Sequence, residues 1–231
     1  MGLEQKAAGA YLLLLAETFL LLFLPAGTVN YPEGWFFLIL FYLPLLFGGL
    51  WLLRRDRELL KKRMNRREPS PRQEKIAALI GILFNTGLVL AGLDQRFGWT
   101  KLPVFLKLSA ACLMLSAYGI CLLAARVNPF LSRTVEVREG QTAVDTGPYR
   151  IVRHPMYAGT SLFFAAVPLL LDSWIAFFAF LPLPFLLCRR LLEEEKMLEE
   201  GLAGYREYMK RVKYRLIPGI NRYFTRFIYS L

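Results

Sequence analysis

The sequence predicts an all-α, polytopic membrane protein. It should have about six membrane-embedded helices, the last two forming a hairpin, and then a C-terminal amphipathic helix at the membrane surface. Composition is the first reason: 55% of the 231 residues are hydrophobic and 14% are aromatic, yet the formal net charge is +11. A soluble domain of this size could not hide so much apolar surface in its core. The second reason is that the apolar residues gather in stretches close to the ~20 residues that a helix needs to cross a bilayer core.

Four of these stretches are predicted to be single transmembrane helices. They cover residues 7–24, 35–53, 76–93 and 102–125. A fifth apolar region, residues 156–188, is too long for one span, and the polar residues Asp172 and Ser173 interrupt it. We therefore expect two helices here, joined by a tight turn.

The positive charge gathers in three segments. Residues 54–75 contain ten Lys and Arg residues, residues 126–153 contain five and residues 189–231 contain ten. Because Lys and Arg flank membrane spans on the cytosolic side, both termini and any site built from these segments are expected to be cytosolic. Such charge also contacts anionic lipid headgroups. Its position at the edges of spans makes nucleic acid a poor candidate partner.

Few side chains inside the predicted helices carry chemistry. Cys112, Cys121 and Cys188 lack the spacing of a metal site, so we expect buried thiols and no metal. Glu17 lies in mid-span, where a carboxylate is costly unless it faces other helices or a polar cavity. A hydrogen bond to a neighbouring helix is the favoured interpretation, ahead of a role in a path for a ligand.

His154 is the only histidine of the chain, and it stands where a polar segment meets an apolar one. Pro155 disfavours helix at His154 and suits the first turn of the following helix. His154 should therefore lie at a helix N-terminus, where free N–H groups favour a negatively charged ligand group. Gly159 would leave room for a ligand or a neighbouring helix. An equally good interpretation is a helix start at the membrane surface, with Tyr149 and Tyr157 as headgroup anchors.

A second polar cluster follows the hairpin. Arg190 and Glu194 are four residues apart and share a helix face, but arginine before glutamate is the less favourable order for such a pair. This order favours a ligand-binding role over a purely solvated face. A tight turn in the hairpin would bring both residues close to His154 and Tyr157.

The segment 202–216 places its apolar side chains on one helical face and most of its charges on the other. The apolar face consists of Leu202, Tyr205, Tyr208, Met209, Val212 and Leu216. This pattern predicts an amphipathic helix on the membrane surface, which could serve as a simple anchor or as a lid over the site.

At these residues the sequence resembles the isoprenylcysteine carboxyl methyltransferase family, whose members are integral membrane enzymes that use S-adenosylmethionine. The resemblance covers residues 128–218. Its motifs are Gly147-Pro148-Tyr149, then Arg153-His154-Pro155 with Tyr157 and Gly159, then Glu194-Glu195 with Leu198, followed by paired tyrosines and a proline.

The resemblance implies a role for each matched residue. The cofactor would be contacted by Gln141, Thr142, Ala143, Val144, Tyr149, His154, Pro155, Met156 and Tyr157. By similarity, Glu194 would close the pocket on the ribose hydroxyls and Arg190 would face a substrate carboxylate. The chain departs from the family pattern at residues 202–204, where Leu-Ala-Gly replaces a Phe-Gly pair, and this difference bears on the choice of substrate.

With this resemblance the chain divides into two parts. Residues 1–125 would form four transmembrane helices with a basic cytosolic loop at 54–75, and residues 126–231 a cofactor-binding methyltransferase core with the hairpin and a cytosolic tail. The expected reaction moves a methyl group from S-adenosylmethionine to a lipophilic acceptor that enters from the bilayer. A carboxylate such as that of a prenylcysteine is the favoured acceptor. It is already ionised at pH 7 and needs no base, and a dry pocket favours a reaction in which a cation and an anion neutralise each other.

Three other functions remain open on the sequence alone. Methylation of a phospholipid or other lipid amine would need a base, and His154 or a carboxylate of residues 193–195 could serve. Membrane sterol reductases resemble the same C-terminal architecture, but their phosphorylated nicotinamide cofactor (NADPH) favours arginines where this chain has glutamates. A non-enzymatic membrane protein is the third alternative, and the presence of His154, Arg190 and Glu194 argues against it.

Overall fold

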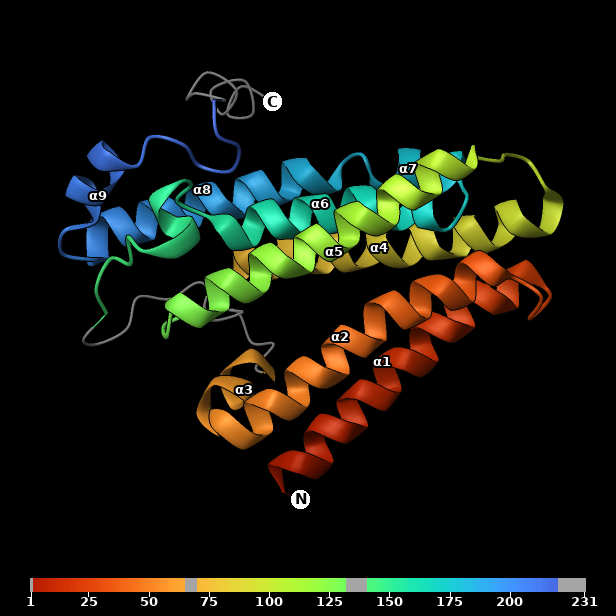
Figure 1. Ribbon diagram of the computed structural model, residues 1–231, viewed down its shortest axis with the longest axis horizontal. Coiled ribbons are helices and arrows are strands. Elements are labelled where there is room, and N and C mark those ends of the chain that lie inside the picture. Colours follow the sequence, from red (N-terminus) through yellow and green to blue (C-terminus); the bar gives the residue numbers. More distant parts are fainter. Residues whose placement is uncertain (1, 65–69, 132–140, 220–231) are drawn as a thin grey trace.

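The chain folds into a bundle of helices (Figure 1). The computed structural model describes residues 2–64, 70–131 and 141–219. Within these ranges there is no β-strand, and an isolated parallel bridge joins Val152 to Tyr214. The elements are α1 (Leu3–Ala26), α2 (Pro32–Arg55), α3 (Arg57–Met64), α4 (Pro71–Phe97), α5 (Val104–Val127), the 3₁₀ turn η1 (Gly147–Arg150), α6 (Pro155–Leu170), α7 (Trp174–Phe180), α8 (Leu183–Gly201) and α9 (Tyr205–Arg211).

The predicted membrane-embedded helices are present. α1, α2, α4 and α5 are each long and apolar enough to cross a membrane, as is the stretch Trp174–Gly201 formed by α7 and α8. α6 is a shorter apolar helix of 16 residues. Large apolar side chains stay exposed along these helices, including Leu13 at 74% and Phe47 at 62%. Such exposure is unfavourable in water and natural in lipid, so the fold is that of a polytopic integral membrane protein.

Successive helices run up and down the bundle, so their connections alternate between its two ends (Figure 1). The turns after α1, α4 and α6 lie at one end, and α3, α9 and the N-terminus lie at the other. α5 packs along α6, and α1 packs along α4. The basic segments therefore meet at one end of the molecule, which we call the basic end. That this end faces the cytosol stays a prediction.

Buried polar contacts fasten the opposite end, where α6 turns into α7. The carboxylate of Asp94 accepts hydrogen bonds from the Ser173 hydroxyl at 2.5 Å and from the backbone N–H of Thr100 at 2.7 Å. The Asp172 carboxylate accepts one from the backbone N–H of Leu102 at 2.7 Å. Asp172 has a φ of 61°, a left-handed conformation in which the chain reverses direction. These bonds hold the turn of the predicted hairpin.

The returning arm of the hairpin differs from the single helix that the sequence predicts. It consists of α7 and α8, which are separated at Leu181 and Pro182. Pro182 and Pro184 cannot donate backbone hydrogen bonds to a preceding turn, so α7 ends before them and α8 begins at them.

The basic segment 54–75, predicted as a loop, contains the short helix α3. The Asp56 carboxylate accepts a hydrogen bond of 2.8 Å from the backbone N–H of Leu59 and so caps this helix. Leu59 and Leu60 are buried in a small apolar cluster, which stabilises α3 against the ends of its neighbours. Residues 65–69 of the segment lie outside the described residues.

The amphipathic tail helix is shorter than predicted. α9 ends at Arg211, and the backbone beyond it pairs with the segment before α6. The N–H groups of Arg153 and His154 donate to the carbonyl oxygens of Tyr214 and Arg215, at 2.9 and 3.0 Å. These bonds require an extended tail, so the helix cannot continue to residue 216.

Two residues singled out within the helices contact neighbouring helices. The Glu17 carboxylate accepts a hydrogen bond of 2.9 Å from Asn85 on α4, in agreement with the favoured interpretation. A Cβ atom on Gly159 would lie 2.6 Å from the Cys121 sulfur and 3.0 Å from the Ala117 carbonyl oxygen. Gly159 thus permits the close approach of α5 to α6.

Candidate active site

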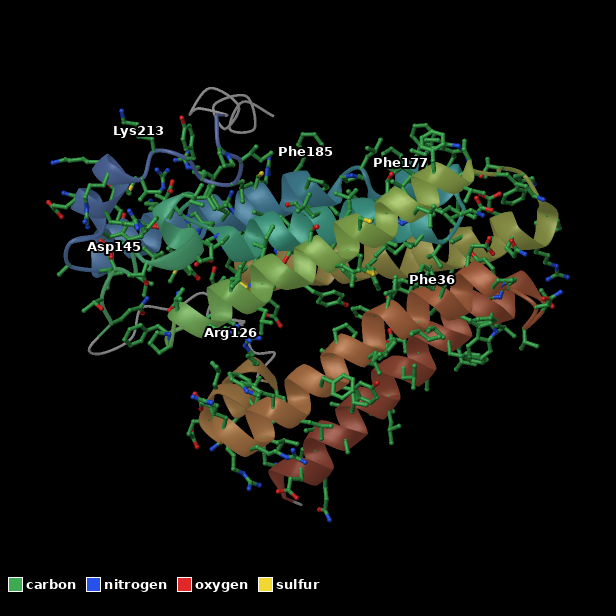
Figure 2. All side chains as sticks on the ribbon, viewed as in Figure 1. Phe36, Arg126, Asp145, Phe177, Phe185 and Lys213 are labelled. Carbon is green, nitrogen blue, oxygen red and sulfur yellow. The ribbon has the colours of Figure 1, made fainter. Side chains whose placement is uncertain are left out.

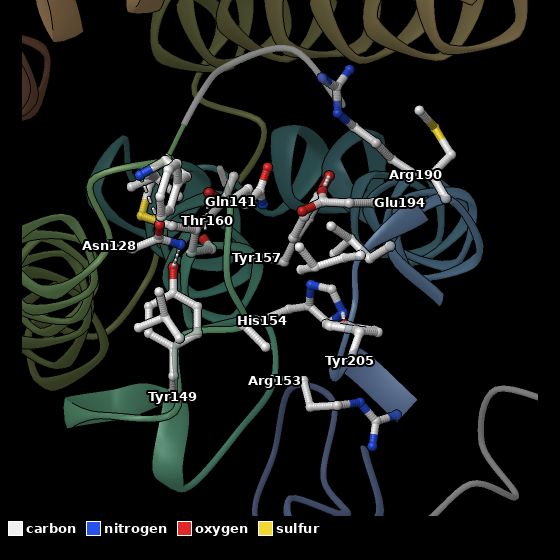
Figure 3. Close-up of a pocket in the computed structure, with 18 of the residues that line it drawn as sticks. Asn128, Gln141, Tyr149, Arg153, His154, Tyr157, Thr160, Arg190, Glu194 and Tyr205 are labelled. Carbon is white, nitrogen blue, oxygen red and sulfur yellow. Dashed lines mark hydrogen bonds between the residues drawn. The ribbon is translucent and has the colours of Figure 1, made fainter. Parts of the chain in front are cut away.

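A pocket of about 350 Å³ lies at the basic end of the bundle (Figure 3). Its walls come from the start of α4, the segments on either side of residues 132–140, the first turns of α6, the middle of α8, and α9. Residues predicted for the site line it: Gln141, Thr142, Ala143, Val144, Tyr149, His154, Met156, Tyr157, Arg190 and Glu194. The fold thus brings together residues that the sequence distributes over three segments. Pro155 is buried behind the wall as the first residue of α6 and does not line the pocket.

The start of α6 has the conformation that the sequence predicts. His154 is the N-cap, in a non-helical conformation with φ −128°, and Pro155 is the first helical residue. The backbone N–H of His154 itself donates to the Arg215 carbonyl oxygen of the tail. The His154 side chain lines the pocket, and its backbone N–H binds the tail.

Behind the histidine, a buried ion cluster joins three segments of the chain. The carboxylate of Glu195 on α8 accepts from Arg153 Nε at 2.7 Å and from Arg215 Nε at 2.6 Å. The His154 ring nitrogen Nε2 lies 3.5 Å from the same carboxylate. Because the side chains of Arg153 and Glu195 are almost wholly buried, water screens this pair little. Glu195 therefore has a structural role, whereas its neighbour Glu194 faces the pocket.

Glu194 and Arg190 occupy the wall of the pocket that α8 provides. The Tyr157 hydroxyl donates a hydrogen bond of 2.7 Å to the Glu194 carboxylate, and the Arg190 guanidinium acts electrostatically on the same hydroxyl. Figure 3 shows these three side chains grouped on one side of the pocket. Arg190 is 9% exposed. A buried cation and a carboxylate thus face the same cavity.

Tyrosine rings form much of the remaining wall. Tyr149 accepts a hydrogen bond of 3.0 Å from Asn128, and Tyr208 donates one of 2.8 Å to the Tyr149 carbonyl oxygen. Burial raises the pKa of the Tyr149 hydroxyl to about 12, while the Asn128 hydrogen bond acts in the opposite direction. Burial also raises the pKa values of Tyr205 and Tyr208. All three side chains are therefore neutral at physiological pH, and their rings can face a ligand cation.

Several lining residues were missed by the sequence analysis. They are Asn128, Arg153, Thr160, Tyr205 and Tyr208, together with apolar side chains of α4 and α8. A signal existed for two of them, since Tyr205 and Tyr208 belong to the apolar face of the tail. The sequence predicted that this face lies on the membrane surface, as an anchor or as a lid over the site, and both tyrosines are buried in the protein beside the pocket.

The fold and the site together define an integral membrane protein with a pocket at one end of a helical bundle. Comparison with known families identifies its chemistry: residues 105–203 match the family model of phospholipid methyltransferases. This match extends from α5 to the end of α8 and so contains most of the pocket. No curated protein matches the chain.

Members of that family are S-adenosylmethionine-dependent methyltransferases, and so is this membrane protein. The isoprenylcysteine carboxyl methyltransferases that its motifs resemble belong to the same superfamily of integral membrane enzymes.

Proposed function

We propose that the enzyme methylates a carboxylate on a lipophilic acceptor, such as a prenylcysteine-type substrate, that reaches the pocket from the bilayer. The observation that carries this proposal is the buried Arg190 side chain in the pocket wall. A guanidinium binds carboxylates through paired charge-assisted hydrogen bonds, so its position in the pocket wall favours a negatively charged substrate group.

The described residues of the pocket fit S-adenosylmethionine. A volume of about 350 Å³ is within the range of small-molecule sites. The Glu194 carboxylate lines the cavity and would accept hydrogen bonds from the ribose hydroxyls, and residues 141–144, which also line it, would contact the cofactor. Tyr149, His154, Met156 and Tyr157 complete this part of the wall.

The bound cofactor would supply an electrophilic methyl group on a sulfonium cation. The neutral tyrosine rings stabilise a cation in the pocket without competing as nucleophiles. Arg190 orients the acceptor carboxylate toward the methyl group, and the buried walls exclude water, which favours the loss of opposite charges in the transition state.

The described carboxylates near the pocket already accept hydrogen bonds: Glu193 from Gln73, Glu194 from Tyr157 and Glu195 from two arginines. An acceptor that needs no base agrees with this arrangement.

A second candidate is methylation of a phospholipid amine, which the family match favours. The tyrosines that would surround a sulfonium could equally surround a methylated ammonium group. The acceptor amine would have to lose a proton, and Glu194 or His154 is the group in the pocket that could receive it.

A single assay separates the two candidates. Purified enzyme receives S-adenosylmethionine with a labelled methyl group and either an N-acylated S-prenylcysteine or phosphatidylethanolamine. A methyl ester releases volatile methanol in alkali, whereas an N-methyl product does not. Alkali-labile label on the first acceptor supports the carboxylate proposal; alkali-stable label on the second alone replaces it with N-methylation.

A further inference from the structure

A second groove opens at the basic end, between the junction of α2 with α3 and the last turn of α5. It has a volume of about 490 Å³. It is lined by Trp51, Arg55, Asp56, Leu59, Ala125, Arg126 and Pro129, none of which lines the pocket of the active site. Figure 2 shows Arg126 at this place, at the end of α5 that faces α3.

The groove is positively charged. Arg55 and Arg126 are exposed, and neither makes an ion pair with a described residue. Arg55 lies over the Trp51 ring at 5.9 Å from its centroid, an arrangement that leaves its hydrogen-bond donors available. The groove contains one described carboxylate, Asp56, and this group already accepts the N–H of Leu59 as the cap of α3.

Arg63 continues this charge into the protein. Arg63 lies one turn after Leu59 on α3, and Cys121 lies one turn before Ala125 on α5. The charge of Arg63 acts on Cys121 and on Tyr149. Its Nη2 atom is buried and has no hydrogen-bond partner among the residues that the structure describes. Burial lowers the pKa of this guanidinium. A buried donor without an acceptor costs about 1–3 kcal/mol, so an anion that reached Arg63 would be bound favourably.

We propose that this groove binds the phosphate of an anionic membrane phospholipid, with Arg55 and Arg126 at its mouth and Arg63 at its inner end. Guanidinium groups bind phosphate through paired charge-assisted hydrogen bonds. A lipid fits better than a free phosphate because exposed apolar side chains lie within two turns of both arginines at the mouth, at Leu50 on α2 and at Leu122 and Leu123 on α5. Trp51 is the amphipathic ring expected at the level of the headgroups.

The site is separate from the methyl acceptor site, but it adjoins it. The charge of the Arg63 guanidinium acts on Tyr149, whose ring is part of the pocket wall. Binding of a phospholipid in the groove does not depend on which acceptor the enzyme methylates.

Binding of phosphatidylglycerol to the full-length protein, titrated in detergent and followed by native mass spectrometry, tests the proposal. Arg63→Gln, Arg55→Gln and Arg126→Gln should each weaken binding about ten-fold. Arg54→Gln is the matched control, because it removes the same charge from the neighbouring exposed position on α2 and should change binding less than two-fold. Arg63→Lys, which keeps the charge, should bind with intermediate affinity.

Two further arms identify the ligand. Phosphatidylcholine should bind at least ten-fold more weakly than phosphatidylglycerol, and 10 mM inorganic phosphate should not displace the lipid. Equal weakening by Arg54→Gln, or equal binding of phosphatidylcholine, would overturn the proposal, and displacement by inorganic phosphate would reassign the site to free phosphate. Affinity for S-adenosylhomocysteine should be unchanged in each variant, which would show that the protein is folded. This control does not depend on which acceptor the enzyme methylates.

Discussion

The Tyr157 hydroxyl on α6 donates a 2.7 Å hydrogen bond to the Glu194 carboxylate on α8, although the two residues are 37 positions apart. This bond joins the open ends of the two hairpin arms within one wall of the pocket. The hairpin turn is held by Asp94 and Asp172 at the far end of the bundle. Polar contacts therefore join the two arms of the hairpin at both ends of the bundle.

Glu194→Gln should weaken binding of S-adenosylhomocysteine by about ten-fold or more. A neutral amide accepts hydrogen bonds less strongly than a carboxylate, and a hydrogen bond to a charged group contributes about 1.5–3 kcal/mol. Calorimetry on the detergent-purified protein measures the change. Glu200→Gln, at an exposed position on the same helix, should bind like the parent protein. Equal affinities of the two variants would remove Glu194 from the cofactor site.

Arg190→Ala should reduce kcat/KM for a carboxylate acceptor by about a hundred-fold, in line with the loss of a charge-assisted hydrogen bond of about 3 kcal/mol. Affinity for S-adenosylhomocysteine should change less than three-fold. Arg189→Ala removes an exposed arginine from the preceding position and should leave both quantities unchanged. If Arg190→Ala lost cofactor affinity and activity to the same extent, its role as an acceptor-orienting residue would be wrong.

Gly159→Ala should destabilise the bundle by about 1–3 kcal/mol, because the added methyl group meets the Cys121 sulfur and the Ala117 carbonyl oxygen. Thermal unfolding in detergent reports the change. Gly119→Ala on α5 is the control: a Cβ there meets nothing within 4 Å, so that variant should be at least as stable as the parent. The double variant Gly159→Ala with Cys121→Ala should recover part of the loss. A stable Gly159→Ala protein would contradict the close approach of α5 to α6.

Arg153→Met should lower the free energy of unfolding by about 3 kcal/mol, since it removes one partner of a buried ion pair and leaves Glu195 with fewer cations. The tail should then detach more readily, and limited proteolysis should cut it earlier. The matched surface change is Lys196→Met, whose partner Glu200 lies 3.9 Å away and is well exposed. This variant should differ from the parent by less than about 1 kcal/mol. Similar effects of the two substitutions would show that the buried cluster does not hold the tail.

The orientation in the membrane can be tested by cysteine labelling in intact cells. In a background with Cys112, Cys121 and Cys188 replaced by alanine, Thr28→Cys lies in the turn after α1 and Lys210→Cys lies on α9. A membrane-impermeant thiol reagent should label the first and should label the second only after the cells are permeabilised. The reverse pattern would place the active site on the outer face.

Much of the fold follows from local properties of the chain. Whether a stretch such as 35–53 or 102–125 enters the membrane depends on the summed transfer free energy of its own side chains. The first lies within α2, and the second coincides with α5 except for its first two residues. The hairpin was predictable for the same reason, because Asp172 and Ser173 interrupt an apolar run. The extent of α9 was not predictable from the sequence. The helix ends because the tail that follows it pairs with Arg153 and His154, which lie far away in sequence.

The sequence alone determined the class of fold and the residues around which the pocket is built, because apolar length and the order of short motifs are carried by neighbouring residues. Only the tertiary structure decided what each charged side chain does. Glu194 and Glu195 are adjacent on α8, yet one faces the pocket with Tyr157 while the other is buried between Arg153 and Arg215. That difference arises because successive residues of a helix point about 100° apart, so their partners depend on which elements pack on each side.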